Sequence, residues 1–151
     1  MRRHSERGST LPEMAIAAVA VLMLIFGIID FGRAMYTYGF VSYLARQGAR
    51  WAVVRGSTSC ANSNNQLVDC NATQAQVQSY VQSLSEGATI ASDFTVTVNP
   101  GTPTCPPDSP ATNAPGCTVA VQVTYPFNFG MGFMPKGTYN ISSTSTMVIS
   151  Q

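Results

Sequence analysis

The sequence predicts an α+β fold in which one long N-terminal helix packs on a small three-stranded antiparallel sheet, together with one short second helix. Three observations lead to this prediction. Sixteen residues from Met14 to Ile29 carry no charge. Apolar residues continue at helical spacing beyond them, and no proline occurs from Phe31 to Val54. The second half of the chain alternates strand-like runs with segments rich in proline or glycine.

The first element is a helix long enough to cross a membrane. Pro12 suits a first helical turn. The 19 residues from Leu11 to Ile29 would form about 28 Å of helix at ~1.5 Å per residue. A bilayer has a hydrocarbon core of about 30 Å. Residues 9–30 are therefore predicted to be the transmembrane half of the long helix.

The charges that flank this span predict its orientation. Arg2, Arg3 and Arg7 precede it, and no comparable basic cluster follows it. Positive flanks stay in the cytoplasm, so residues 31–151 are expected on the exported side. A secretory signal peptide also has a basic start and an apolar core. The run ends in Phe26-Gly-Ile-Ile-Asp30, however, without the small residues of a signal-peptidase site.

The helix is expected to continue beyond the membrane to about residue 55. Arg46 and Arg50 share one of its faces, and Arg55-Gly56 provides a basic last turn followed by a glycine stop. Apolar residues recur there at steps of three and four, at Phe31, Ala34, Met35, Tyr38, Val41, Ala45, Ala49 and Ala52.

The remaining elements are shorter. A second helix is predicted over 73–86, with Thr73 as its cap. Alternating residues predict strands over 94–98, 118–125 and 139–149, with Ile141 and Val148 on core positions of the last strand. A sheet this small needs a helix packed on it. The outer half of the long helix is the candidate.

The four cysteines agree with export. Cys60 and Cys70 are ten residues apart, and Cys105 and Cys117 are twelve apart. These spacings do not match the CxxC pairs of zinc or redox sites. Two local disulfides are the simplest interpretation in an oxidising compartment. Four cysteines allow three pairings, and the sequence alone does not choose among them.

Composition argues against several classes of function. Charged residues make up 10% of the chain and the net charge is +1, so nothing indicates nucleic-acid binding. The single histidine, His4, lies in the basic N-terminal segment. An exported Ser-His-Asp or Cys-His catalytic site is therefore excluded. No metal-ligand cluster or phosphate-binding loop is evident, so we expect no enzyme activity and no cofactor.

The N-terminal segment resembles the cleavage site of type IV prepilins and pseudopilins. Gly8 is followed by Ser9 and, five positions after the glycine, by Glu13. An ionisable residue at the edge of a membrane span is a functional candidate by default. The resemblance implies that a prepilin peptidase removes residues 1–8 and leaves a free amino group on Ser9. Glu13 would then pair with the amino terminus of a neighbouring subunit, whereas its plainer role is that of an acid in the first helical turn.

A closer resemblance is to the TadE-like family, the pseudopilins of tight-adherence (Tad, Flp) pilus systems. It rests on Gly8 and Glu13, on Asp30 with Gly32-Arg33, on the run from Ala45 to Ala52 and on the strand end Val123-Thr-Tyr-Pro-Phe127. It is strongest over residues 7–55. The chain departs from the family pattern in having Met14 after the glutamate and no proline near Val19–Leu22.

This resemblance implies a structural subunit of a bacterial pilus, held in the inner membrane before assembly. Its implied partners are the prepilin peptidase, other pilin subunits and the assembly platform. Asp30 and Arg33 are expected to pair at the membrane surface. Arg46 and Arg50 are expected to form a solvated face or a clamp on the sheet. All four are also candidate subunit contacts. The alternative is a single-span anchored adhesin or envelope binding module that never polymerises.

Overall fold

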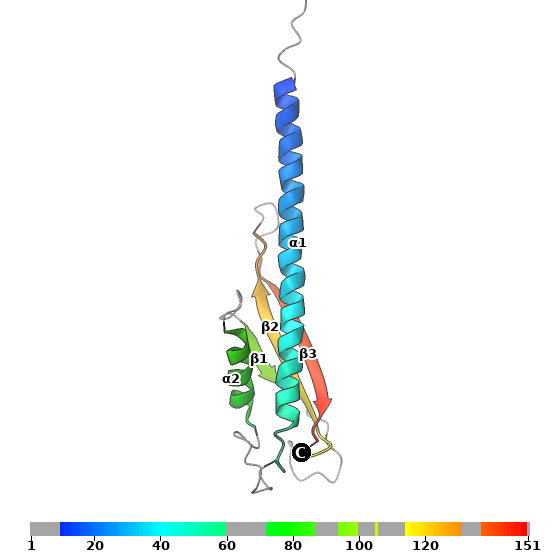
Figure 1. The fold of residues 1–151 in the computed structure, drawn as a ribbon, viewed down its shortest axis with the longest axis vertical. Helices are drawn as coiled ribbons and strands as arrows, with labels where there is room; N and C mark the ends of the chain where they lie inside the picture. The colour runs from blue at the N-terminus through cyan, green and yellow to red at the C-terminus, as the bar shows by residue number, and fades with distance from the viewer. Residues whose placement is uncertain are drawn as a thin grey trace, which may run out of the picture.

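The computed structural model describes residues 10–59, 72–86, 94–99, 105, 114–130 and 137–150. They form two helices, α1 (Thr10–Val53) and α2 (Gln74–Ser85), and three strands, β1 (Thr95–Val98), β2 (Thr118–Phe127) and β3 (Tyr139–Val148). Figure 1 shows α1 running the length of the molecule, with the sheet and α2 beside its C-terminal half only. The predicted α+β fold is confirmed.

Helix α1 is one uninterrupted element of 44 residues, about 66 Å long at ~1.5 Å per residue. It begins two residues before Pro12 and ends two residues before Arg55, close to the predicted limits. Its N-terminal half stands clear of the rest of the chain in Figure 1. Its C-terminal half lies against the sheet and α2, and this is where the hydrophobic core forms.

Helix α2 is short and begins at a complete capping box. The Thr73 hydroxyl accepts a hydrogen bond from the backbone N–H of Gln76, while the Gln76 side chain accepts one from the backbone N–H of Thr73. Such reciprocal bonds satisfy two backbone donors that a helix start otherwise leaves free. The side chain of Gln78 then donates to the carbonyl of Val96 at 2.6 Å, which ties α2 to β1. The predicted cap is confirmed.

The sheet is antiparallel, in the order β1-β2-β3. Val96 lies opposite Val123, and Val121 lies between Val98 and Ser145. These side chains face the helices. Alternate positions carry mostly threonine, serine and glutamine and remain at least partly exposed. The result is two layers, with one covered and one open face of the sheet, as is common in antiparallel sheets.

Strand β2 extends two residues further than predicted, to Phe127. Pro126 is paired with Asn140 of β3 and lies past the residues that pair with β1, which end at Thr124. One side of β2 is therefore open there. A proline, which has no backbone N–H, is tolerated at such an edge.

The core forms where α1, α2 and β2 meet. Gly48 of α1 lies so close to both neighbours that an added Cβ would be 2.8 Å from a Val81 methyl group and 3.0 Å from a Val121 methyl group. Leu44, Ala45 and other small or branched residues complete the buried set, which is Val41, Leu44, Ala45, Ala49, Ala52, Val77, Val81, Phe94, Val96, Ala114, Cys117, Val119, Val121, Val123 and Ile149.

The placement of Val148 on a core position is wrong. Val148 is 58% exposed, whereas Ile141 is partly buried against the core and Ile149 is buried. Successive strand side chains point to opposite faces, so residues seven apart cannot share a face in a regular strand. The inward positions of β3 are odd-numbered, from Ile141 to Met147.

The C-terminal half of α1 buries only some of the apolar residues that recur at helical spacing. Val41, Ala45, Ala49 and Ala52 are buried as part of the core. Phe31, Met35 and Tyr38 belong to the same series but are exposed. Asp30 and Thr37 are buried in this region instead. The helical period was sufficient to predict the helix, but it did not identify which face the sheet covers.

Candidate functional site

The N-terminal half of α1 carries most of the exposed large apolar side chains among the described residues. Only 6% of its most apolar 18-residue stretch is buried within the protein, and the helix is long and apolar enough to cross a membrane. A core helix of a soluble protein would be covered instead. The exposed large side chains lie all around it: Leu11, Met14, Ile16, Val19, Val21, Leu22, Met23, Leu24, Ile25, Phe26, Ile28 and Ile29.

Glu13 is the acidic residue in the first turn of α1 and is exposed. A carboxylate there interacts favourably with the positive end of the helix dipole. It lies 17 positions before Asp30, or about 26 Å along the axis at ~1.5 Å per residue. The two acids therefore mark opposite ends of the apolar half. Gly8 and Ser9, the predicted processing residues, lie outside the described residues.

Asp30 and Arg33 are paired where the apolar half ends. An Nη1 of Arg33 donates to Oδ1 of Asp30 at 3.1 Å, and the side chains are 57% and 8% exposed respectively. The pairing agrees with the prediction, but the burial of Asp30 was not foreseen. One turn later the Thr37 hydroxyl donates to the Arg33 carbonyl at 2.9 Å.

What covers Asp30 is the end of the β2–β3 hairpin. The Arg33 guanidinium lies over the Phe127 ring, 5.7 Å from its centroid. Gly130 is close enough that an added Cβ would be 3.4 Å from Oδ1 of Asp30. Sequence reasoning did not identify this contact. The available signal was the aromatic and glycine-rich composition of residues 126–137, together with the strand end that resembles the TadE-like family.

The other two candidate contact residues lie on the open side of α1. Arg46 and Arg50 are exposed, and the Nε of Arg46 donates to the carbonyl of Ser42 at 3.1 Å. Neither is brought next to Asp30 or Glu13. They lie on the polar face of the C-terminal half of α1, away from its buried face. Their part in contacts with other subunits stays a prediction.

A disulfide joins Cys105 and Cys117. The prediction of this local pair is confirmed. Cys117 is fully buried immediately before β2, and its backbone N–H donates to the carbonyl of Ala114. The bond therefore ties the start of the central strand to the preceding segment. Cys60 and Cys70 lie outside the described residues.

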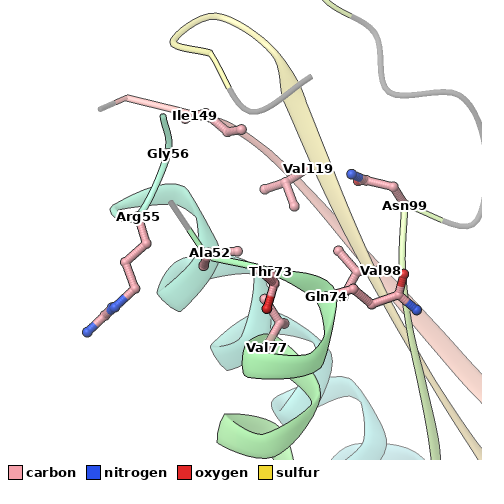
Figure 2. Close-up of a pocket in the computed structure, with 11 residues that line it drawn as sticks. Ala52, Arg55, Gly56, Thr73, Gln74, Val77, Val98, Asn99, Val119 and Ile149 are labelled. Atoms are coloured by element: carbon pink, nitrogen blue, oxygen red, sulfur yellow. The ribbon is translucent and has the colours of Figure 1, made fainter. Parts of the chain in front are cut away.

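A pocket of about 340 Å³ lies at the other end of the domain, where α1 ends and α2 begins. Figure 2 shows its lining residues, among them Thr73, Val98 and Asn99. Arg55 extends away from them in this view, and its guanidinium stacks on the Trp51 ring at 4.1 Å. Arg55 is the charged residue among those that line the pocket, and the other lining residues are apolar or neutral polar. This arrangement does not indicate a catalytic centre.

Residues 8–50 of the chain match the family model described as TadE-like protein. The matched segment includes Gly8, Glu13, Asp30 and Arg33, and it ends within α1. The resemblance to the TadE-like family is confirmed over these residues. That family is a structural component of pilus systems and not a family of enzymes. No curated protein and no solved structure matches the chain.

Proposed function

We propose that this protein is a structural subunit of a bacterial tight-adherence pilus, a TadE-like minor pilin or pseudopilin that assembles through its N-terminal helix. The observation that carries the proposal is the division of α1. One continuous helix has an uncovered apolar half at Thr10–Ile29 and a half packed into a folded domain at Asp30–Val53. The family match over residues 8–50 supports the same conclusion.

The uncovered half needs an apolar environment from outside the chain. Exposed apolar surface costs about 25 cal/mol per Å² in water, and a helix that is hydrophobic all around is normally surrounded by lipid or protein. A bilayer supplies this environment before assembly. The apolar halves of neighbouring subunits supply it within a filament.

The continuity of α1 favours a filament subunit over a plain anchored adhesin. An adhesin needs only a tether between membrane and domain. Here the helix passes from the apolar half into the core without a break, so the domain is held at a set distance and angle from the span. Subunits that pack into a regular array require this kind of fixed geometry.

Glu13 has a specific role in this proposal. Cleavage after Gly8 by the prepilin peptidase leaves an amino group on Ser9. In the filament, the carboxylate of Glu13 pairs with the amino group of a neighbouring subunit. Each charge thereby gains a partner in an apolar environment, where an unpaired ion costs several kcal/mol.

The proposed location follows from the flanking charges. The basic residues before α1 stay in the cytoplasm, and the domain after Asp30 is exported from the inner membrane. The Cys105–Cys117 bond supports the exported location, because disulfides persist in oxidising compartments. The assembly platform would then extract the subunit from the membrane into the growing filament.

The test replaces Glu13 with leucine and compares it with Met14→Leu. Glu13→Leu is expected to insert in the membrane and to be cut after Gly8, yet to be lost from filaments. Glu13→Gln should be nearly as defective, because it retains the shape without the charge. Met14 is an exposed neighbour on the same helix, so Met14→Leu should assemble normally.

The measurements are the intact mass of the membrane protein and its amount in sheared surface filaments. A mature chain that starts at Ser9 supports the proposal. If Glu13→Leu were incorporated into filaments normally, Glu13 would have no role in assembly and would act only as an acidic residue at the start of the helix. A chain that keeps residues 1–8 would favour the anchored adhesin or envelope binding module.

A further inference from the structure

The end of the β2–β3 hairpin lies beside the point where the apolar half of α1 stops. We call residues 127–130 and 137–139 the hairpin tip. Phe127 lies under the Arg33 guanidinium, and Gly130 packs beside the Asp30 carboxylate. In Figure 1 the C-terminal end of β2 is directed toward the free half of α1, and the rest of the domain extends away from it.

The position of the hairpin tip relative to a bilayer follows from α1. Asp30 is the first charged residue after the uncharged run from Met14 to Ile29. From Thr10 to Asp30 the helix rises about 30 Å at ~1.5 Å per residue, which equals the thickness of a hydrocarbon core. When Thr10 lies at one edge of the core, Asp30 lies at the other. The hairpin tip, in contact with Asp30 and Arg33, then lies at the level of the lipid headgroups.

The chemistry of the hairpin tip suits that level. Phe127, Phe129 and Tyr139 form a chain of edge-to-face contacts, with ring centroids 5.0 and 5.3 Å apart. Phe127 is buried, Phe129 is half-buried and Tyr139 is 45% exposed. Tyrosine, with an apolar ring and a polar hydroxyl, is enriched where membrane meets water. The Arg33 side chain, whose guanidinium lies over Phe127, is 57% exposed, and an arginine at this level can bind lipid phosphates.

We propose that the hairpin tip is a second membrane contact, which rests in the headgroup region of the outward-facing leaflet through Phe129 and Tyr139, with Arg33 beside them. This inference rests on the proposed function, since it requires α1 to span the bilayer. A single transmembrane helix can tilt in the bilayer. A second contact, held to α1 by Asp30 and Arg33, limits that tilt and so fixes how the domain stands over the membrane surface.

The experiment places a tryptophan at chosen depths in the full chain. Trp51 is first changed to phenylalanine to remove the native signal. Tyr139→Trp and Phe129→Trp report on the hairpin tip. Phe26→Trp, in the apolar half, is the reference for contact with lipid tails. Tyr43→Trp is the matched control, because Tyr43 is 44% exposed but lies about 20 Å beyond Asp30 at ~1.5 Å per residue.

Each variant is reconstituted in vesicles of phosphatidylethanolamine and phosphatidylglycerol, with and without bromine on the acyl carbons nearest the headgroup. Tyr139→Trp and Phe129→Trp are expected to lose emission in the brominated vesicles, whereas Tyr43→Trp keeps its emission. Far-UV circular dichroism that matches the parent chain identifies variants that have folded. Two reporters at the hairpin tip keep the test valid if one of them fails to fold.

The outcomes separate this inference from the proposed function. If Phe26→Trp is quenched while both hairpin-tip reporters behave like Tyr43→Trp, the span stands and the second contact is wrong. Blue-shifted emission at the hairpin tip without quenching would also overturn it, because protein and not lipid would then cover the rings. If Phe26→Trp is not quenched, the span itself fails, and the proposed function fails with it.

Discussion

The two halves of α1 are continuous in backbone but opposite in environment. Leu22, in the first half, is 51% exposed, whereas Leu44, in the second half, is 1% exposed. Both are leucines in regular helix. The difference arises from their neighbours: a sheet and a second helix cover Leu44, and nothing in the described chain covers Leu22. A residue's contribution to stability therefore depends on its partner and not on its secondary structure.

The composition of the two halves reflects these environments. The first half is apolar around its whole circumference, whereas the second has a polar face that carries Arg46 and Arg50. The buried face of the second half uses small residues, including Ala45, Gly48 and Ala49, which allow α1 to approach β2 closely. The first half has no polar face of this kind, and its side chains, from alanine to phenylalanine, are apolar on every side of the helix. Both halves are regular helix, and the polar face is what distinguishes them.

The largest expected difference between the halves comes from truncating one leucine in each. Leu44→Ala should lower the free energy of unfolding of the exported domain by about 2–5 kcal/mol, since it leaves a cavity in a packed core. Leu22→Ala should change it by no more than about 0.5 kcal/mol. The measurement is urea unfolding of the full chain in detergent micelles, followed by the fluorescence of Trp51, which stacks on Tyr80. Equal losses in the two variants would show that the halves unfold together.

A second comparison uses two glycines of the outer half. Gly48→Ala should destabilise the domain by about 1–3 kcal/mol, because its methyl group would overlap Val81 and Val121. Gly39 has no atom within 4 Å of an added Cβ, so Gly39→Ala should stabilise the helix by up to about 1 kcal/mol. The same unfolding assay measures both. A loss of stability in Gly39→Ala would reveal a contact on the face that is open in the isolated subunit.

The smallest effect is expected at the edge of the folded half, where α2 begins. Thr73→Ala removes the hydroxyl that caps α2 and should cost about 1 kcal/mol. Thr73→Ser keeps the hydroxyl and should be nearly neutral. A domain as stable with alanine as with serine would indicate that contacts with α1 and β1 hold α2 without its cap.

Several features could be predicted from residue pattern because their causes are local. Each of these features depends only on neighbouring residues and on the surrounding water or lipid. They are the uncharged run before Asp30, the capping residue Thr73 and the alternation in 118–125. Cys105 and Cys117 are close in sequence, so a disulfide between them was the simplest of the possible pairings to predict. The TadE-like resemblance belongs to the same class, since the matched residues lie almost entirely within one helix.

Other features were decided only by the tertiary structure. Nothing local to Asp30 indicates that Gly130, a hundred positions later, packs against it. The sequence by itself determined that α1 would be a long helix with an apolar half, because helical spacing and side-chain hydrophobicity are properties of contiguous residues. Only the tertiary structure decided which face of its outer half is buried and that the hairpin tip meets it at Asp30 and Arg33, because burial requires a partner that chain folding brings from distant positions.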